Sequence, residues 1–389
     1  MDYNHLLSPV ARSLKPSGIR KFFDIVNTME DAISLGVGEP DFDTPWQVRR
    51  AGITALEKGR TFYTSNWGLM DLRREIARYL ERRFQLSYHP DNEILVTVGG
   101  SEGIDNVLRA VVAPGDEVLI PEPSFVCYEP LTRLAGGVPV PLVTRAEDQF
   151  RLTPELLRPA ITDKTKLLIL PFPNNPTGAI MTREDLTAIA DVLRGTDVLV
   201  LSDEIYSELT YPFSHTSFAA IPGMRERTVV VNGFSKSYAM TGWRLGYAAG
   251  PREIMEQACI IHQYGIMSSP TVSQFAALEA LRTGDEDIEH MRNQYNIRRV
   301  FLLNRLREIG LECFEAQGAF YLFPSIACTG LTSETFCETL LQEQKVAVVP
   351  GNAFGDSGEG FVRISYSYSL THLKEACDRI ERFVQAHRK

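Results

Sequence analysis

"VNGFSKSYAMTGWRLGYAAG", residues 231–250, places a lysine between two predicted strands. The apolar run 228–232 ends in a turn of small residues that carries Ser235 and Lys236, and a second strand begins after Arg244. Open α/β sheets bind ligands just past the carboxyl ends of their strands. A lysine desolvated there has a lowered pKa and can form a Schiff base with a carbonyl, whereas most lysines are solvated surface cations.

The surrounding chain alternates amphipathic helical patterns with short apolar runs. Helices are predicted over 45–59, 69–84, 101–112 and 182–194. The runs LLIL (167–170) and VLVL (198–201) are apolar throughout, which is typical of strands covered on both faces. We therefore expect an α/β fold whose large domain has a mostly parallel central sheet flanked by helices.

Beyond residue 285 the pattern changes. A charged amphipathic stretch over 285–310 predicts one long helix, and strand-like segments and a last helix follow it. This is typical of a small α+β domain. The expected division is a large domain over 46–285 and a small domain built from 1–45 and 286–389.

Composition excludes several classes of protein. The 389 residues are 44% hydrophobic and 23% charged with net charge -9, which argues against a general nucleic-acid or acidic-membrane surface. The six cysteines have no CxxC or metal-ligand spacing, which favours free thiols in a reducing, cytoplasmic setting and predicts no metal. Neither a signal peptide nor an apolar run long enough to span a bilayer is expected.

Polar residues follow two other predicted strands. Asp203 ends the run VLVLSD, Tyr206 lies three residues later, and Asn175 lies in PFPNNPTG after the run LLIL. A carboxylate fixed at a strand end can pair with a protonated ring nitrogen, which is the partner that pyridoxal phosphate requires. Tyr206 could then reach the phenolic oxygen of the ring. The alternative is that Asp203 caps a turn and that PFPNNPTG is only a loop.

A phosphate site is predicted where VTVGGSEG turns from a strand into a helix. The backbone N–H groups of Gly100, Ser101 and Glu102 would form an anion site at the helix N-terminus, with Ser235 and Arg244 completing it. The spacing matches neither GxGxxG nor GxxxxGK[ST], so a dinucleotide fold and a P-loop are disfavoured.

Two residues have a structural and a functional interpretation. Arg363, within the strand-like EGFVRISYSY, is either a paired structural residue or a bidentate clamp for a substrate carboxylate. Phe125, in PEPSFVCYEP, is either a core residue or a ring that lies flat on an aromatic cofactor.

Together these motifs resemble the class I/II aminotransferases, which are fold type I pyridoxal-phosphate enzymes. SKSYAMTGWRLG, preceded in order by NNPTG and SDEIY, carries the resemblance, which covers nearly the whole chain. It implies a homodimer and a ping-pong transfer of an amino group from an L-amino acid to a 2-oxo acid. A Schiff base at Lys236 is implied, with Asp203 on the pyridine nitrogen and Asn175 and Tyr206 on the phenolic oxygen.

The same resemblance implies the remaining roles. Phe125 would stack on the ring, and Gly100, Ser101, Ser235 and Arg244 would hold the phosphate. Tyr63 would reach the phosphate in the neighbouring subunit. Arg363 would bind the substrate α-carboxylate, with the backbone of Gly38 closing over it.

Some positions depart from the family pattern, and alternatives remain. Gly233 replaces a frequent hydroxyl residue, which weakens Ser235 as a phosphate ligand, and Phe125 stands where relatives use tyrosine or tryptophan. Aromatic amino acids or alanine are the expected donors and 2-oxoglutarate the expected acceptor. The alternatives are a C–S β-lyase, a non-enzymatic binding protein that kept the fold, and a nicotinamide-dependent dehydrogenase.

Overall fold

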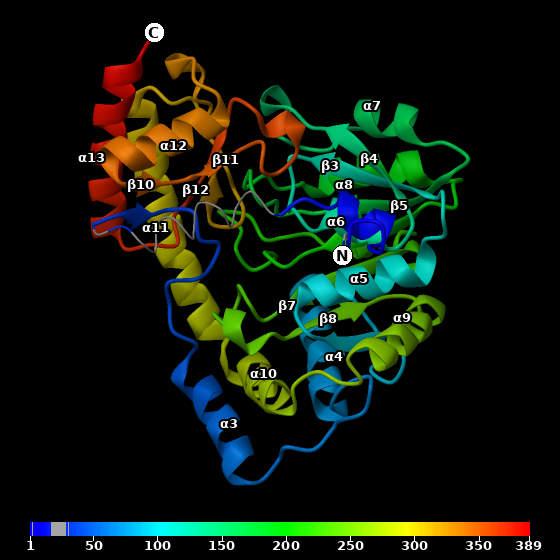
Figure 1. Cartoon of the computed structure of the whole chain (residues 1–389). Coiled ribbons are helices and arrows are strands. Elements are labelled where there is room, and N and C mark those ends of the chain that lie inside the picture. Colours follow the sequence, from blue (N-terminus) through cyan, green and yellow to red (C-terminus); the bar gives the residue numbers. More distant parts are fainter. Residues whose placement is uncertain (2, 17–28, 30) are drawn as a thin grey trace.

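A seven-stranded sheet forms the centre of the larger part of the molecule (Figure 1). The computed structural model describes residues 1, 3–16, 29 and 31–389. The strand order is β2-β8-β7-β6-β5-β3-β4. The strands are β2 (Ile94–Thr97), β3 (Glu117–Glu122), β4 (Val138–Val143), β5 (Thr165–Leu170), β6 (Leu199–Asp203), β7 (Thr228–Gly233) and β8 (Gly246–Ala249).

Helices pack on this sheet because its strands are apolar on both faces. Every residue of β2, β7 and β8 is buried, and so is the predicted apolar run 167–170 of β5. The helices of this part are α3 (Trp46–Glu57), α4 (Met70–Phe84), α5 (Gly100–Val111), α6 (Tyr128–Leu134), α7 (Pro154–Leu157), α8 (Arg183–Leu193), α9 (Arg252–Gly265) and α10 (Thr271–Thr283). The short helix α1 (Pro9–Ser13) lies near α6 (Figure 1).

The strand directions bring distant residues to one edge of the sheet. Strands β4, β3, β5, β6 and β7 are parallel, and β8 is antiparallel to both β7 and β2. Strand β2 therefore runs in the same direction as β7. The carboxyl ends of these parallel strands and the amino end of β8 consequently share one edge, where open α/β sheets bind ligands.

A second, smaller group of elements packs beside this edge. It comprises α11 (Asp285–Ile309), β9 (Tyr321–Leu322), α12 (Ser333–Gln344), β10 (Val346–Ala347), β11 (Val349–Pro350), β12 (Val362–Ser365) and α13 (Leu370–His387). Strand β12 lies between β11 and β9, and β1 (Ile33–Ser34) pairs with β10. The last helix, α13, lies beside α11 and α12 at the far side from the seven-stranded sheet (Figure 1).

The expected fold class is confirmed: helices flank a mostly parallel sheet, accompanied by a smaller α+β part. Among the helices of the described residues, none has the length and apolar character needed to cross a membrane.

Candidate active site

Lys236 follows β7 at the ligand-binding edge of the sheet. Its side chain is half-buried, and Nζ donates a hydrogen bond to the carbonyl oxygen of Gly38 at 2.6 Å. Burial lowers the pKa of Lys236 to about 8, against the raising effect of Glu39 and with the further lowering effect of Arg363 and Arg244. Near neutral pH, part of the amine is therefore unprotonated and nucleophilic.

Asp203, the last residue of β6, is a buried carboxylate with 7% of its surface exposed. Oδ2 accepts a hydrogen bond from the Tyr128 hydroxyl at 2.8 Å, and Oδ1 accepts one from the backbone N–H of Ile205 at 3.2 Å. Burial raises the pKa of Asp203 to about 6, although both hydrogen bonds act in the opposite direction. The negative charge of a buried carboxylate is strongly stabilised by a cationic partner.

Tyr206 lies beside Lys236, with its ring centroid 5.9 Å from Nζ. Its hydroxyl is hydrogen-bonded to the hydroxyl of Tyr321, from β9, at 2.8 Å. The Tyr321 hydroxyl also lies against Gly38, where an added Cβ would come within 2.4 Å of it. Two parts of the structure and the segment around Gly38 therefore meet at this pair of tyrosines.

Arg363 is held in the middle strand of the small sheet, with 2% of its surface exposed. Nη1 donates to Oδ1 of Asn175 at 2.8 Å, and Nη2 donates to the carbonyl oxygen of Gly36. The guanidinium lies over the ring of Tyr321, 4.5 Å from its centroid. Nε is buried and has no partner within the described residues, so the guanidinium retains a donor for a ligand.

The turn between β2 and α5 brings backbone N–H groups and Arg244 together. Gly99 has φ +79, and a Cβ added there would lie 2.8 Å from Nη2 of Arg244. Gly246 packs against the same turn, since its Cβ would lie 2.7 Å from the carbonyl carbon of Gly99. The helix N-terminus at Gly100 and the Arg244 cation together form an electropositive site that suits a phosphate.

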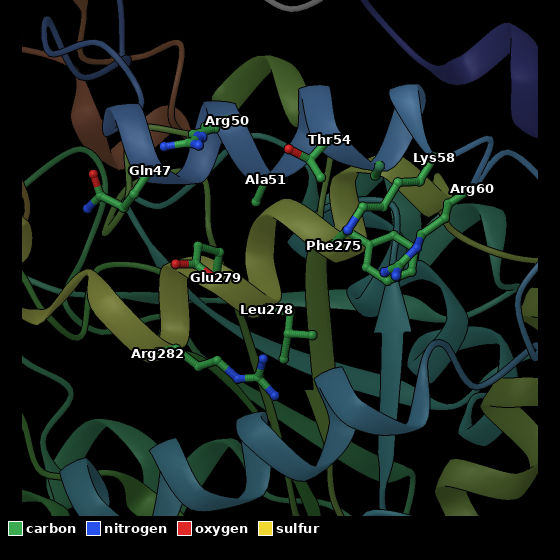
Figure 2. Close-up of a pocket in the computed structure, with 11 residues that line it drawn as sticks. Gln47, Arg50, Ala51, Thr54, Lys58, Arg60, Phe275, Leu278, Glu279 and Arg282 are labelled. Atoms are coloured by element: carbon green, nitrogen blue, oxygen red, sulfur yellow. The ribbon is translucent and has the colours of Figure 1, made fainter.

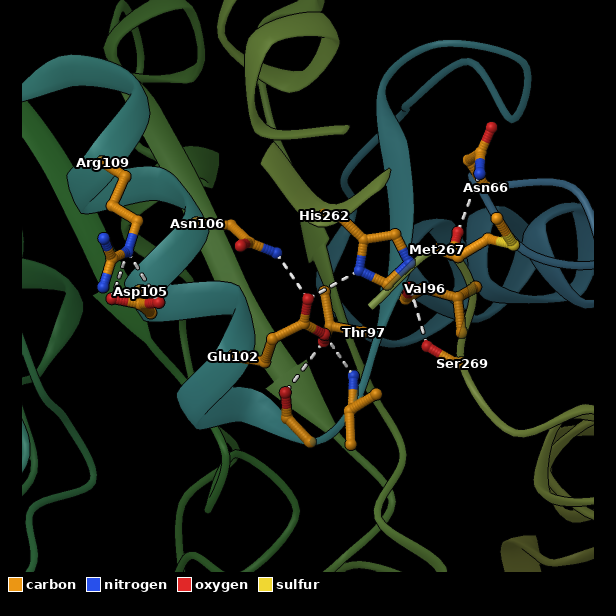
Figure 3. Close-up of polar contacts among 12 residues, drawn as sticks. Asn66, Val96, Thr97, Glu102, Asp105, Asn106, Arg109, His262, Met267 and Ser269 are labelled. Atoms are coloured by element: carbon orange, nitrogen blue, oxygen red, sulfur yellow. Dashed lines mark hydrogen bonds and ion pairs between the residues drawn. The ribbon is translucent and has the colours of Figure 1, made fainter. Parts of the chain in front are cut away.

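The other predicted residues differ in how closely they approach this site. Ser235 is buried next to Lys236, whereas Ser101 is exposed at the start of α5. The half-buried ring of Phe125 meets the ring of Tyr128 edge-on, with centroids 6.0 Å apart. Tyr63 is 80% exposed, and the side chain of Glu102 points toward His262 (Figure 3).

A separate groove of about 440 Å³ lies between α3 and α10 (Figure 2). Lys58 and Arg60 lie near the ring of Phe275, with the Arg60 guanidinium 4.5 Å from the ring centroid, and Arg282 lines another part of the groove. None of the predicted site residues lines this groove, which is therefore distinct from the candidate active site.

Sequence reasoning missed several residues that contact the predicted ones. Tyr128 begins α6 three residues after Phe125, and no local pattern of the sequence links it to Asp203. Gly36 and Tyr321 carry no such signal either, because their proximity to Arg363 depends on how the two parts of the structure pack.

Known proteins are similar to this chain over most of its length. Residues 30–380 match the family described as "Aminotransferase class I and II". The protein YugH of Bacillus subtilis (strain 168) is 54% identical over 97% of this chain and 98% of its own length. The aspartate aminotransferase of Pyrococcus abyssi is 47% identical over 96% of each chain. A solved aromatic aminotransferase from Pyrococcus horikoshii is 45% identical with TM-score 0.90, over 94% of this chain and 99% of that one.

Proposed function

The chain belongs to the class I and II aminotransferases, which depend on pyridoxal phosphate, and on this basis we propose that it transfers the amino group of a neutral L-amino acid to a 2-oxo acid. Aromatic amino acids or alanine are the proposed donors and 2-oxoglutarate the proposed acceptor. The observation that carries the proposal is the meeting of Lys236, Asp203 and Arg363 at one edge of the sheet.

The residues at this edge fit the cofactor. The Asp203 carboxylate is buried and suits a protonated pyridine nitrogen, and the Lys236 amine suits the cofactor's aldehyde. The phosphate would bind the N–H groups of Gly100, Ser101 and Glu102 together with Arg244 and Ser235. Asn175 and Tyr206 would contact the phenolic oxygen, and Phe125 would cover the ring.

The bound cofactor supplies an electron sink for negative charge at the donor Cα. Lys236 Nζ is the proposed base, which takes the proton from Cα and later returns one. Its lowered pKa, about 8, suits both events near neutral pH. The 2.6 Å hydrogen bond to the Gly38 carbonyl oxygen supports this role, because it orients the amine toward the substrate-binding side.

Arg363 is the proposed ligand of the substrate α-carboxylate. Its contacts to Asn175 and Gly36 fix the guanidinium plane, and its unpaired Nε offers a donor. The backbone of Gly38 would close over the bound substrate. Such a clamp aligns the Cα–H bond with the proton-accepting amine.

The charges around Lys236 support a neutral donor. The cations that act on its pKa are Arg363 and Arg244, and the proposal already assigns both. The remaining charges are the carboxylates Glu39 and Asp203, which would repel a second carboxylate on the donor. Among the groups of the described residues that shift the Lys236 pKa, no unassigned cation is left as a counter-ion for an acidic donor side chain.

The test is the visible absorption of the purified protein with single amino acids and no 2-oxo acid. We expect aromatic amino acids and alanine to change the cofactor band fastest, and Lys236→Ala to show no band that responds. Aspartate reacting much faster than these donors would refute the neutral-donor proposal. A protein that stays colourless after incubation with pyridoxal phosphate would refute the mechanism.

A homodimer with shared active sites is also proposed. Tyr63 would reach the phosphate in the partner subunit, and the apolar side chains of Phe62, Tyr264, Ile266 and Met267 are also exposed. The Thr271 hydroxyl donates to the carbonyl oxygen of Phe62 at 2.6 Å, which joins these segments into one surface.

The division into domains and the cellular location complete the proposal. We propose a large domain over 46–285 and a small domain over 1–45 and 286–389; residues 2, 17–28 and 30 of the latter lie outside the described chain. The separate seven-stranded and three-stranded sheets support this division. A cytoplasmic location is proposed from the cysteine usage of the sequence.

A further inference from the structure

The carboxylate of Glu102 ties together three segments beside the phosphate-binding turn (Figure 3). Oε2 accepts a hydrogen bond from the backbone N–H of Val98 at 2.5 Å. Oε1 accepts one from Nδ2 of Asn106 at 2.7 Å and is 2.6 Å from Nδ1 of His262. The carboxylate thus connects the end of β2, the first turns of α5, and α9.

His262 reaches this carboxylate from α9, which packs against α5. Its side chain has no exposed surface, and Nε2 has no hydrogen-bond partner within the described residues. The Glu102 carboxylate is therefore the one polar contact of the ring in the described chain. A fully buried imidazole held by a single carboxylate fixes the position of that carboxylate in turn.

The position of Glu102 matters because the turn that it contacts directly precedes the anion site. Gly99 has a left-handed backbone, and the Thr97 hydroxyl donates to its carbonyl oxygen at 2.9 Å. The hydrogen bond from Val98 N–H fixes the other side of this turn. The direction of the N–H groups at Gly100 and Ser101 follows from these contacts, and phosphate binding depends on that direction.

The hydrogen bonds to Glu102 also control where its negative charge lies. A carboxylate in the first turn of a helix stabilises that helix but repels a phosphate at the same N-terminus. Donors from Val98, Asn106 and His262 share this negative charge and hold it on the α9 side of the turn, as Figure 3 shows for the last two.

We propose that His262 and the side chain of Glu102 are positioning residues that set the affinity for the cofactor's phosphate without contacting it. The proposal rests on the proposed function, because it assumes that the phosphate binds at this turn. It adds a role for the Glu102 side chain, which holds the turn in place, to the predicted phosphate contact of the Glu102 backbone N–H.

The test compares the affinities of the apo-protein for pyridoxal phosphate and for pyridoxal, which lacks the phosphate. In His262→Leu we expect affinity for pyridoxal phosphate to fall about tenfold, the lower end for residues that orient a ligand group. Affinity for pyridoxal should change less than about twofold. His262→Gln, whose amide can still donate to Glu102, should recover most of the loss. Arg109→Ala, which breaks the Asp105–Arg109 pair on the same helix, is the control and should change neither affinity.

Each outcome separates this inference from the proposed function. Equal losses of affinity for pyridoxal phosphate and for pyridoxal in His262→Leu would overturn the inference, because a purely structural role of His262 weakens the binding of both ligands. A wild-type protein that binds neither ligand would overturn the proposed function itself. If His262→Leu does not fold, Asn106→Leu removes another donor to the same carboxylate and should show the same selective loss; an unselective loss there overturns the inference.

Discussion

At the residue scale, the hydrogen bond from Tyr128 to Asp203 decides how readily Asp203 holds a negative charge. This bond lowers the Asp203 pKa, which burial raises to about 6. Tyr128→Phe removes it, so the Asp203 pKa rises and the carboxylate becomes protonated at higher pH. We expect the acidic limb of the pH profile of kcat to move to higher pH and kcat to fall about tenfold, the typical worth of a hydrogen bond to a charged group.

The control for this prediction is Tyr247→Phe. Tyr247 is also buried, but its hydroxyl has no partner within the described residues, so its removal should leave the pH profile unchanged. An acidic limb in Tyr128→Phe that coincides with that of the wild type would show that Tyr128 does not act on Asp203.

The pKa of Lys236 gives a second prediction at this scale. The amine must be neutral to attack an aldehyde, and a pKa of about 8 leaves about a tenth of it neutral at pH 7. The rate at which the apo-protein takes up pyridoxal phosphate should rise with pH up to about 8 and level off above it. With an ordinary lysine amine, the rate of uptake should continue to rise toward pH 10. Uptake that still rises steeply between pH 9 and pH 10 would contradict the lowered pKa.

The sequence predicts those site residues that the ends of strands position. Lys236, Asp203 and Asn175 each follow an apolar run, and parallel strands bring such positions to one edge. This rule does not predict Tyr128 and His262, because each contacts a carboxylate, Asp203 or Glu102, from a separate helix. Their partners depend on how α6 and α9 pack, which no local pattern encodes.

At the scale of elements, the same distinction holds. The strands of the central sheet other than β4, and helices α4, α5, α8, α11 and α13, follow from the pattern of the sequence, whereas β4 was not predicted. Helix α10 was not predicted, because its buried residues, among them Gln274, Ala277 and Leu281, are spread around the helix and leave a weak amphipathic pattern.

The segment from β1 to Gly38 gives a prediction at the element scale. A Cβ at Gly38 would come within 2.4 Å of the Tyr321 hydroxyl, whereas the ring carbon that bears this hydroxyl would be 3.5 Å away. Gly38→Ala should therefore lower the free energy of unfolding by about 1–3 kcal/mol through overpacking. Tyr321→Phe removes the clashing oxygen and should recover most of that loss in the double variant. Denaturant unfolding gives the free energy of unfolding of the wild type, the two single variants and the double variant. Additive losses in the double variant would show that the segment moves away from Tyr321.

At the scale of the whole molecule, the exposure of Tyr63 raises the question of which subunit it serves. Tyr63 is 80% exposed, and the Asn66 amide next to it donates to the carbonyl oxygen of Met267 at 2.8 Å. An exposed aromatic residue on an apolar surface, held in place by backbone contacts, suits a partner-facing role. If Tyr63 completes the partner's phosphate site, each active site needs Lys236 from one chain and Tyr63 from the other.

Hybrid dimers purified with two affinity tags test this arrangement. A hybrid of a Lys236→Ala chain and a Tyr63→Ala chain contains one site with both residues intact, so about half of the wild-type activity should return. The matched hybrid of a doubly substituted chain with a wild-type chain contains no intact site and should be nearly inactive. If Tyr63 serves its own subunit, the two results exchange, with the matched hybrid half active and the first hybrid weak. The comparison therefore assigns Tyr63 to one subunit or the other from the ratio of two activities, and this ratio measures the loss that Tyr63→Ala causes in a site that keeps Lys236.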